Sequence, residues 1–253
     1  MNVSGDVRRY WNERIHDLDM ARHPPGTREF FADLDEYRFD KLRYLPEMID
    51  FNGYGGKRIL EVGCGIGIDL VRFARGGARA VGVDLSTTAT VLAKKNAGHS
   101  GVAVQLTIAD GERLPYDDES FDMVYGHGVL QYTADPRQMI HECRRVLRRE
   151  GEAIFMVYNR ISWLNALSKL TKVDLEHQDA PVIRMYSIAE FRDLLSVFER
   201  VRLVPERFPV KSRLHGGVKG LLYNRGFVGT FNLLPRAWVR RFGWHLMAFC
   251  SRA

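Results

Sequence analysis

Residues 61–67 combine a carboxylate with three evenly spaced glycines, in the order Glu61-Val-Gly-Cys-Gly-Ile-Gly67. The apolar run at 58–62 predicts a short buried strand, and the residues after the loop predict the start of a helix. Glycine at positions 63, 65 and 67 removes the Cβ atoms that would hold a ligand away from the backbone, and it permits the positive φ of tight turns. Bare backbone next to the N-terminus of a helix attracts anionic groups. The segment therefore predicts a site for a nucleotide-like ligand.

Two further acids follow expected strands. Asp84 ends the run 80–84, and Asp110 comes directly after the run 102–109. Strands and helices alternate along this part of the chain, which indicates a mostly parallel sheet covered on both faces. Since parallel sheets bind ligands at the carboxyl ends of their strands, we expect Glu61, Asp84 and Asp110 to meet at one cavity.

Three motifs in this order resemble the class I S-adenosylmethionine-dependent methyltransferase family. They are Glu61-Val-Gly-Cys-Gly-Ile-Gly67, Val81-Gly-Val-Asp84-Leu-Ser86, and Ala109-Asp110-Gly-Glu-Arg-Leu-Pro115 followed by Ser120-Phe-Asp-Met-Val-Tyr125. The sequence looks closest to the small-molecule branch that includes ubiquinone and menaquinone methyltransferases, and the match covers about residues 57–160. The resemblance implies a cofactor, S-adenosylmethionine, with S-adenosylhomocysteine as its product.

The resemblance also implies roles for single residues. Glu61 would hold the amino group of the cofactor, Asp84 its ribose hydroxyls and Asp110 its adenine amino group. Leu85 and Leu114 would sandwich the base, or either would simply be a core residue. Each acid has a plainer alternative, as a loop cap, a helix N-cap or a turn residue respectively. The full set of expected cofactor-binding residues is Glu61, Gly63, Cys64, Gly65, Gly67, Asp84, Leu85, Asp110, Gly111, Glu112 and His127.

A dinucleotide dehydrogenase is the nearest competing interpretation of the glycine loop. Its fingerprint is G-x-G-x-x-G. Here position 68 is Ile, so the third glycine comes one place early. The acid at Asp110 also has no counterpart in that fingerprint, and the sequence therefore disfavours this reading.

His127 is the candidate catalytic residue. It lies just past the fourth expected strand, in Tyr125-Gly-His-Gly-Val-Leu-Gln-Tyr132. An unperturbed imidazole titrates near pH ~6.5, which suits the deprotonation of a phenol or an amine. The alternative is that His127 only packs beside the methionine end of the cofactor. Small-molecule members of the family often carry a histidine pair where this chain has Gln131-Tyr132, so analogy does not identify a substrate. Tyr158 and Asn159, after the fifth strand, are expected to face the same pocket.

The whole pattern predicts an α/β fold with a Rossmann-like, doubly wound, mostly parallel sheet of seven strands whose last strand is antiparallel. Residues 1–50 are expected to form a helical lid, and residues 51–253 a methyltransferase domain with cap insertions at about 161–186 and 211–243. Apolar walls for the cavity, or a core within the caps, would come from Trp163, Tyr186, Phe227, Phe231 and Trp238.

Strands are expected at 58–62, 80–84, 102–109, 121–125, 153–158, 199–204 and 244–250. Helices are expected at 69–75, 87–97 and 136–149, and after a capping box at 187–190.

The composition, 45% hydrophobic and 27% charged over 253 residues, is that of a soluble globular protein. The three cysteines are scattered, and their odd number and wide spacing predict neither a disulfide framework nor a zinc site. We expect no metal. The N-terminal residues lack the apolar core of a secretory signal, and no apolar run approaches the ~20 residues of a spanning helix. These features favour a cytoplasmic protein.

Positive charge is concentrated at the C-terminus. Residues 200–253 contain eleven Lys or Arg and one acid, Glu206, a net charge of +10 against +6 for the whole chain. Such a segment favours an anionic substrate, phospholipid headgroups or nucleic acid, or is simply a solvated basic surface. Arginines alternate with aromatics from Trp238 to Trp244, a pattern that fits peripheral contact with a membrane or a lipophilic, anionic acceptor.

The leading functional hypothesis is therefore transfer of a methyl group to O, N or C of a small metabolite by in-line displacement. An RNA or DNA methyltransferase is the first alternative, suggested by the basic segment. The sequence Tyr-Gly-His-Gly at 125–128 differs from the Asn/Asp-Pro-Pro-aromatic motif of adenine-amino methyltransferases and disfavours it. A non-catalytic cofactor-binding module of the same fold is the second alternative. No particular oligomeric state is favoured.

Overall fold

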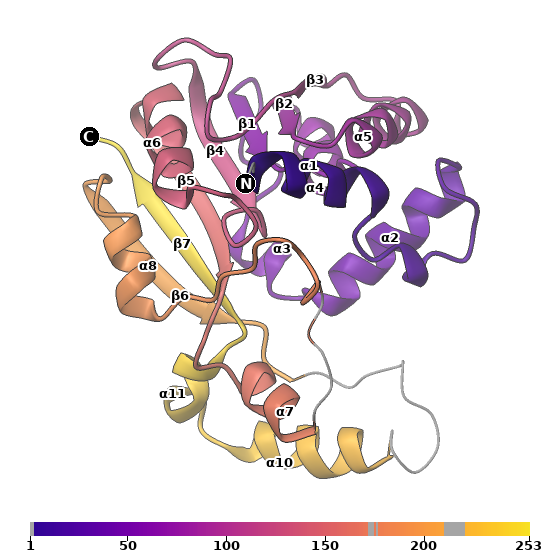
Figure 1. Ribbon diagram of the computed structural model, residues 1–253, viewed down its shortest axis with the longest axis vertical. Coiled ribbons are helices and arrows are strands. Elements are labelled where there is room, and N and C mark those ends of the chain that lie inside the picture. The colour runs from indigo at the N-terminus through magenta and orange to yellow at the C-terminus, as the bar shows by residue number, and fades with distance from the viewer. Residues whose placement is uncertain (1–2, 172–174, 176, 210–220) are drawn as a thin grey trace.

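The computed structural model describes residues 3–171, 175, 177–209 and 221–253, and a seven-stranded sheet runs through its centre (Figure 1). The strand order is β3-β2-β1-β4-β5-β7-β6, and β7 is antiparallel to both of its neighbours, while β1 to β5 pair in parallel. This arrangement confirms the predicted fold class. The strands are β1 (Arg58–Val62), β2 (Arg79–Asp84), β3 (Gln105–Ile108), β4 (Phe121–His127), β5 (Leu147–Tyr158), β6 (Arg200–Glu206) and β7 (His245–Ser251).

Helices cover both faces of the sheet and continue into the N-terminal and C-terminal segments (Figure 1). Those within the alternating region are α4 (Ile68–Arg75), α5 (Thr87–Ser100), α6 (Pro136–Val146) and α8 (Ile188–Leu194). The N-terminal segment contains α1 (Val3–Glu13), a 3-10 turn at Leu18–Met20, α2 (Arg28–Lys41) and α3 (Leu45–Met48). The C-terminal third adds α7 (Trp163–Thr171), a π-helical turn at Leu222–Phe227, α10 (Val228–Leu233), α11 (Arg236–Val239) and a 3-10 turn at Arg240–Phe242.

The alternation of side chains along β1 divides the core into two layers. Leu60 and Val62 belong to the cluster that includes Ile140 of α6, whereas Ile59 belongs to the cluster that includes Phe73 of α4. Because successive strand residues point to opposite faces, a strand that is apolar on both sides is covered on both sides. This burial fixes the register of β1, and with it the position of the glycine loop that follows.

Several predicted boundaries are wrong, most clearly the end of α6 and the start of β5, which was expected at residue 153. We expected a helix to residue 149, but α6 ends at Val146 and β5 begins at Leu147. Arg148 donates to Asp122 of β4 (Nη1 to Oδ1, 2.6 Å), and Arg252 donates to the terminal carbonyls of Arg144 and Arg145. Pairing with β4 and capping by a distant arginine therefore override the helical propensity of this polar run.

The C-terminal helices form a cluster apart from the rest of the molecule. In Figure 1, α7, α10 and α11 lie together at the lower end of the view, beyond the ends of β6 and β7. Trp163 packs against Phe227 and Phe231, with ring centroids 5.8 and 6.5 Å apart, and Trp238 is 72% exposed.

The predicted helix after the capping box is confirmed as α8. The three cysteines are free and buried.

The capping box provides a test of local stability. The Ser187 hydroxyl accepts from the Glu190 N–H, and the Glu190 carboxylate accepts from the Ser187 N–H. We expect Ser187→Ala to lower the free energy of unfolding by about 1 kcal/mol, measured by urea denaturation. Ser196→Ala, at an exposed position after the same helix, is the control. Equal stability of the two variants would contradict the capping role.

Candidate active site

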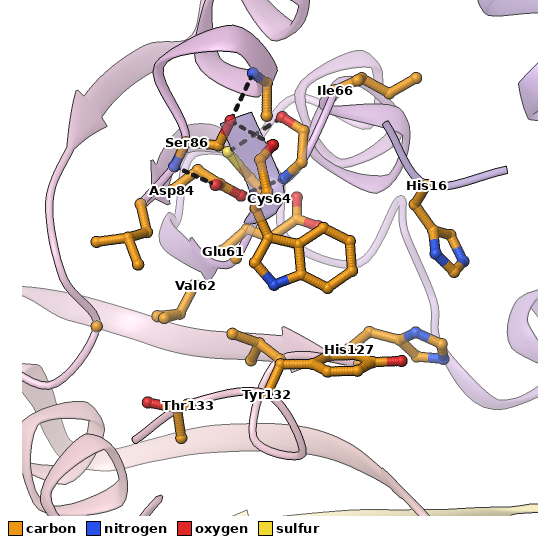
Figure 2. Close-up of a pocket in the computed structure, with 18 of the residues that line it drawn as sticks. His16, Glu61, Val62, Cys64, Ile66, Asp84, Ser86, His127, Tyr132 and Thr133 are labelled. Atoms are coloured by element: carbon orange, nitrogen blue, oxygen red, sulfur yellow. Dashed lines mark hydrogen bonds between the residues drawn. The ribbon is translucent and has the colours of Figure 1, made fainter. Parts of the chain in front are cut away.

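A cavity lies at the carboxyl ends of β1, β2 and β4, and α1 and α2 form part of its wall. Figure 2 shows Glu61, Cys64, Asp84 and Ser86 together at one part of it, with His127 and Tyr132 across from them. The cavity therefore has two halves. The glycine loop and the acids border the first half, and residues from α2, β4, β5 and the C-terminal segment border the second.

The glycine loop has the backbone that its sequence predicts. The φ angles of Gly63, Gly65 and Gly67 are +71°, +53° and +76°, a region that other residues rarely occupy. A Cβ at Gly63 would lie 2.7 Å from Val129, whereas one at Gly65 would meet no protein atom within 4 Å and Gly65 borders the cavity. Gly67 lies outside the cavity lining and turns the chain into α4. Its predicted contact with the cofactor stays a prediction.

Asp84 holds this loop in place. Its Oδ2 accepts from the Gly65 N–H and its Oδ1 from the Ser86 N–H, both at 2.8 Å. A carboxylate has about four lone-pair positions, so each oxygen keeps capacity for a further donor. Burial raises the pKa of Asp84, and the backbone N–H groups of Ser86, Gly65 and Leu85 oppose that shift. Asp84 thus fixes the glycine loop through its hydrogen bonds, and it is also a hydrogen-bond acceptor at the cavity wall.

Glu61 is a buried acid at the wall of the first half of the cavity. Its Oε2 has no hydrogen-bond partner among the described residues. Burial, reinforced by the nearby charge of Asp69, raises the pKa of Glu61 well above its usual value, while Arg38 opposes that shift. A buried carboxylate oxygen without a donor is costly. A cationic donor in the cavity, such as an ammonium group, would satisfy it.

The third acid stands on a turn at the edge of the cavity. Asp110 accepts from the Glu112 N–H at 3.0 Å, and Asp110, Gly111 and Glu112 all border the cavity. Glu112 itself is bonded to the loop after β4, through Thr133 Oγ1 at 2.5 Å and the Asp135 N–H at 2.8 Å. Of the two leucines predicted to sandwich a base, Leu85 borders the cavity and Leu114 lies in the core instead.

His127 stands at the boundary with the second half of the cavity. Its Nδ1 lies 3.3 Å from Arg38 Nη2, and its Nε2 lies 3.2 Å from the Tyr44 hydroxyl. Arg38 in turn pairs with the buried Asp69, which also accepts from the Tyr125 hydroxyl at 2.8 Å. Burial, with a smaller contribution from Arg38, lowers the pKa of His127 to about 3. The imidazole is therefore neutral near pH 7 and a poor base in this environment, which weakens the predicted catalytic role.

The sequence analysis missed several residues of the second half. Arg38, Lys41, Arg207 and His245 all border the cavity, and none belongs to a local motif. A histidine within the apolar run of the last strand was the one signal that the sequence offered for His245. Arg207 and Arg38 carry no such signal, because long-range folding alone brings them to the cavity.

Some of the other residues predicted to face the cavity border it, and others do not. Tyr158 borders the cavity, but the Asn159 amide donates to the carbonyls of Arg241 and Gly243 instead. Several residues of the N-terminal segment border the cavity, among them Trp11 and His16. The aromatic residues expected as cavity walls, Trp163, Tyr186, Phe227, Phe231 and Trp238, are absent from the lining that the described residues form.

Comparison with known proteins agrees with this geometry. Residues 60–155 match the family model described as a methyltransferase domain. This part of the chain is therefore similar to a methyltransferase domain. The matched segment contains the glycine loop, Asp84 and Asp110, which are among the parts of the chain that form the first half of the cavity.

Curated relatives share only part of their length with this chain. A ubiquinone biosynthesis O-methyltransferase of Actinobacillus pleuropneumoniae is 34% identical over 125 residues, which are 47% of this chain and 53% of that protein. Another with the same name, from Alkalilimnicola ehrlichii, is 31% identical over 156 residues, 58% of this chain and 61% of that protein. The chain thus spans about half the length, or slightly more, of the curated relatives it matches.

Solved structures show the same fold over most of the chain. A geranyl diphosphate C-methyltransferase of Streptomyces coelicolor A3(2) has a TM-score of 0.62 at 16% identity, covering 100% of this chain and 99% of its own. A possible histamine N-methyltransferase from Thermotoga maritima has a TM-score of 0.58 at 22% identity, covering 88% of this chain and 98% of its own. At these identities the likeness concerns the fold.

The buried environment of His127 predicts the pH range in which its imidazole takes up a proton. Because the pKa of His127 in the folded chain is about 3, against ~6.5 for a free imidazole, the folded chain binds fewer protons than the unfolded chain between these values. His127 should therefore reduce stability as the pH falls below about 6.5. Its imidazole resonances should not move between pH 8 and pH 5 in NMR, with His127→Gln to assign them. A midpoint near pH 6.5 would contradict the buried, neutral state.

Proposed function

We propose that this chain transfers the methyl group of S-adenosylmethionine to O, N or C of a small metabolite. The observation that carries the proposal is the convergence of Glu61, Asp84 and Asp110 on one cavity, beside a loop of bare backbone. The three acids match three features of the cofactor, its amino group, its ribose hydroxyls and its adenine amino group. The unpartnered Glu61 Oε2 is the atom that the amino group would satisfy.

The bound cofactor supplies an activated methyl group on a sulfonium. The protein then has to align the acceptor and to keep water away. Tyr132, Met156 and Tyr158 border the second half of the cavity, and we assign the acceptor to that half. His127 lies between the two halves, and because both of its ring nitrogens contact protein groups, Arg38 and Tyr44, we propose that it packs beside the reacting groups as a neutral ring. A small acceptor is favoured over nucleic acid because α1 and α2 form part of the cavity wall.

Gly65 offers a sharp test of the cofactor site. We expect Gly65→Ala to lower the affinity for S-adenosylhomocysteine by about tenfold or more, as measured by calorimetry, because the new methyl group would occupy the cavity. Gly101→Ala is a matched control. Gly101 has a similar φ of +68° and also has no protein atom near its missing Cβ, but it ends α5 away from the cavity.

Both alanine variants should lose about 1–2 kcal/mol of stability from the left-handed backbone, and only Gly65→Ala should lose the ligand. Equal affinities in the two variants would contradict a cofactor pressed against the loop.

The activity itself is tested by incubating the chain with methyl-labelled S-adenosylmethionine and a metabolite extract, followed by mass spectrometry. We expect the label in a small molecule. Label found only in added RNA or DNA would favour the nucleic-acid alternative, and cofactor binding without any labelled product would favour the non-catalytic module.

We also propose that the C-terminal helices touch the surface of an anionic membrane. Leu170, Leu233 and Trp238 are 82%, 84% and 72% exposed, and Arg240 and Arg241 are exposed beside Trp238. Exposed apolar side chains next to cations are suited to the boundary between headgroups and acyl chains. Among the described residues, no helix is both long enough and apolar enough to cross a bilayer.

Sedimentation with lipid vesicles checks this surface. The chain should sediment with phosphatidylserine-containing vesicles and much less with pure phosphatidylcholine. Leu233→Ser combined with Trp238→Ser should greatly reduce the difference, since two of the three exposed apolar side chains are removed. Val91→Ser, at a half-exposed valine of α5, should leave it unchanged. Equal sedimentation of all three proteins would refute the membrane contact.

A further inference from the structure

Gln131 carries a side-chain amide that the fold buries without a hydrogen-bond partner. The residue is 0% exposed, and among the described residues neither its Oε1 nor its Nε2 has a partner. Burial of such an amide costs free energy, because it has given up its bonds to water without replacing them. A methionine would fill nearly the same space without that cost. The amide therefore indicates that a bound group completes this part of the molecule.

The backbone around Gln131 fixes the amide in this position. The Gln131 carbonyl accepts from the Arg184 N–H at 2.9 Å. The Arg184 guanidinium donates to the carbonyl of Thr133 through Nη1 and to that of Ala134 through Nη2, the latter at 2.9 Å. The loop after β4 is thus bound on both sides of Gln131 to a segment far along the chain. Its backbone, rather than any contact of the amide itself, places the Gln131 side chain in the interior.

Gly128 leaves a small space at the cavity wall next to this amide. Both Gly128 and Met156 border the cavity. A Cβ on Gly128 would lie 3.6 Å from Gln131 Nε2 and 3.5 Å from Met156 Cε, and apart from its chain neighbours it would meet no other heavy atom within 4 Å. The φ of Gly128 is +83°, which glycine adopts readily. The missing Cβ therefore leaves room for a group about the size of a methyl, with Gln131 Nε2 at its border.

The size and polarity of this space favour a hydroxyl group. A hydroxyl is about as large as the missing Cβ, whereas a carboxylate or a phosphate is larger. The unpartnered amide offers both a donor and an acceptor, and a hydroxyl can likewise donate and accept. An ion placed between the Gln131 amide and the Met156 thioether would lose its hydration without meeting an opposite charge there.

We propose that Gln131 is a specificity-determining residue, which binds a hydroxyl group of the methyl acceptor in the space beside Gly128. The apolar part of the acceptor lies against Tyr132, Met156 and Tyr158, which border the same half of the cavity. An acceptor with an apolar group at this point is disfavoured, because it leaves the amide unpartnered. The word acceptor rests on the proposed function, but the hydroxyl site itself can be tested without a reaction.

The test compares phenol with toluene, two probes of the same shape that differ in one hydroxyl group. NMR titration of the full chain in the presence of S-adenosylhomocysteine gives the ratio of phenol affinity to toluene affinity. This ratio should be about fivefold or more lower in Gln131→Met, since only the hydroxyl loses its partner. Gln105→Met makes the same change at an exposed position of β3 outside the cavity lining, and it should keep the ratio of the unmodified chain.

The Gln131 amide supplies a second readout. Its NH₂ resonances, identified by their absence from the spectrum of Gln131→Met, should shift further with phenol than with toluene. Gln131→Met should also unfold at the same urea concentration as the unmodified chain or at a higher one, because the substitution removes no hydrogen bond of the fold.

Four results would overturn the hydroxyl site. They are no binding of phenol, an unchanged affinity ratio in Gln131→Met, an equal fall of the ratio in Gln105→Met, and a lower unfolding midpoint for Gln131→Met. The last result would show that the amide already has a partner in the fold, such as an internal water. If the chain does not bind S-adenosylhomocysteine, the proposed function fails, while the affinity ratios of the three proteins still decide the hydroxyl site.

Discussion

The carboxylate of Asp84 is the constraint on which the site depends. It ends β2 and accepts from the N–H of Gly65 in the loop after β1 and from the N–H of Ser86 at the start of α5. The ends of two parallel strands and the beginning of a helix are thereby tied to one buried group. The tie holds the glycine loop against the cavity with its backbone exposed to a ligand. Loss of this carboxylate would release the loop and remove an acceptor at the same time.

The two halves of the cavity are built in different ways. The first half comes from short segments that follow consecutive strands, so its geometry follows from the parallel sheet itself. The second half gathers Arg38 from α2, His127 from β4, Arg207 from the residues after β6 and His245 from β7. Buried polar groups of this kind are retained only when their donors and acceptors are satisfied.

The same division explains what the sequence could predict. The strand 58–62, the glycine loop, Asp84 and the capping box at Ser187 are local patterns, and the structure has each of them at the predicted position. Arg38, Arg207 and His245 reach the cavity only through contacts between residues far apart in the chain. The end of α6 was misplaced for the same reason, since strand pairing and Arg252 act there from a distance. Leu114 packs in the core and Gly67 turns the chain into α4, and neither belongs to the cavity lining that the described residues form.

The central claim is that this cavity binds an adenosyl sulfonium through its carboxylates and bare backbone. Calorimetric titration of the unmodified chain and of Asp84→Ala with S-adenosylhomocysteine tests it most directly. We predict one binding site per chain and at least about a tenfold weaker affinity in the variant, the loss of a charge-assisted contact worth about 1.4 kcal/mol or more. No binding heat with the unmodified chain, or equal affinities in both proteins, would contradict the account.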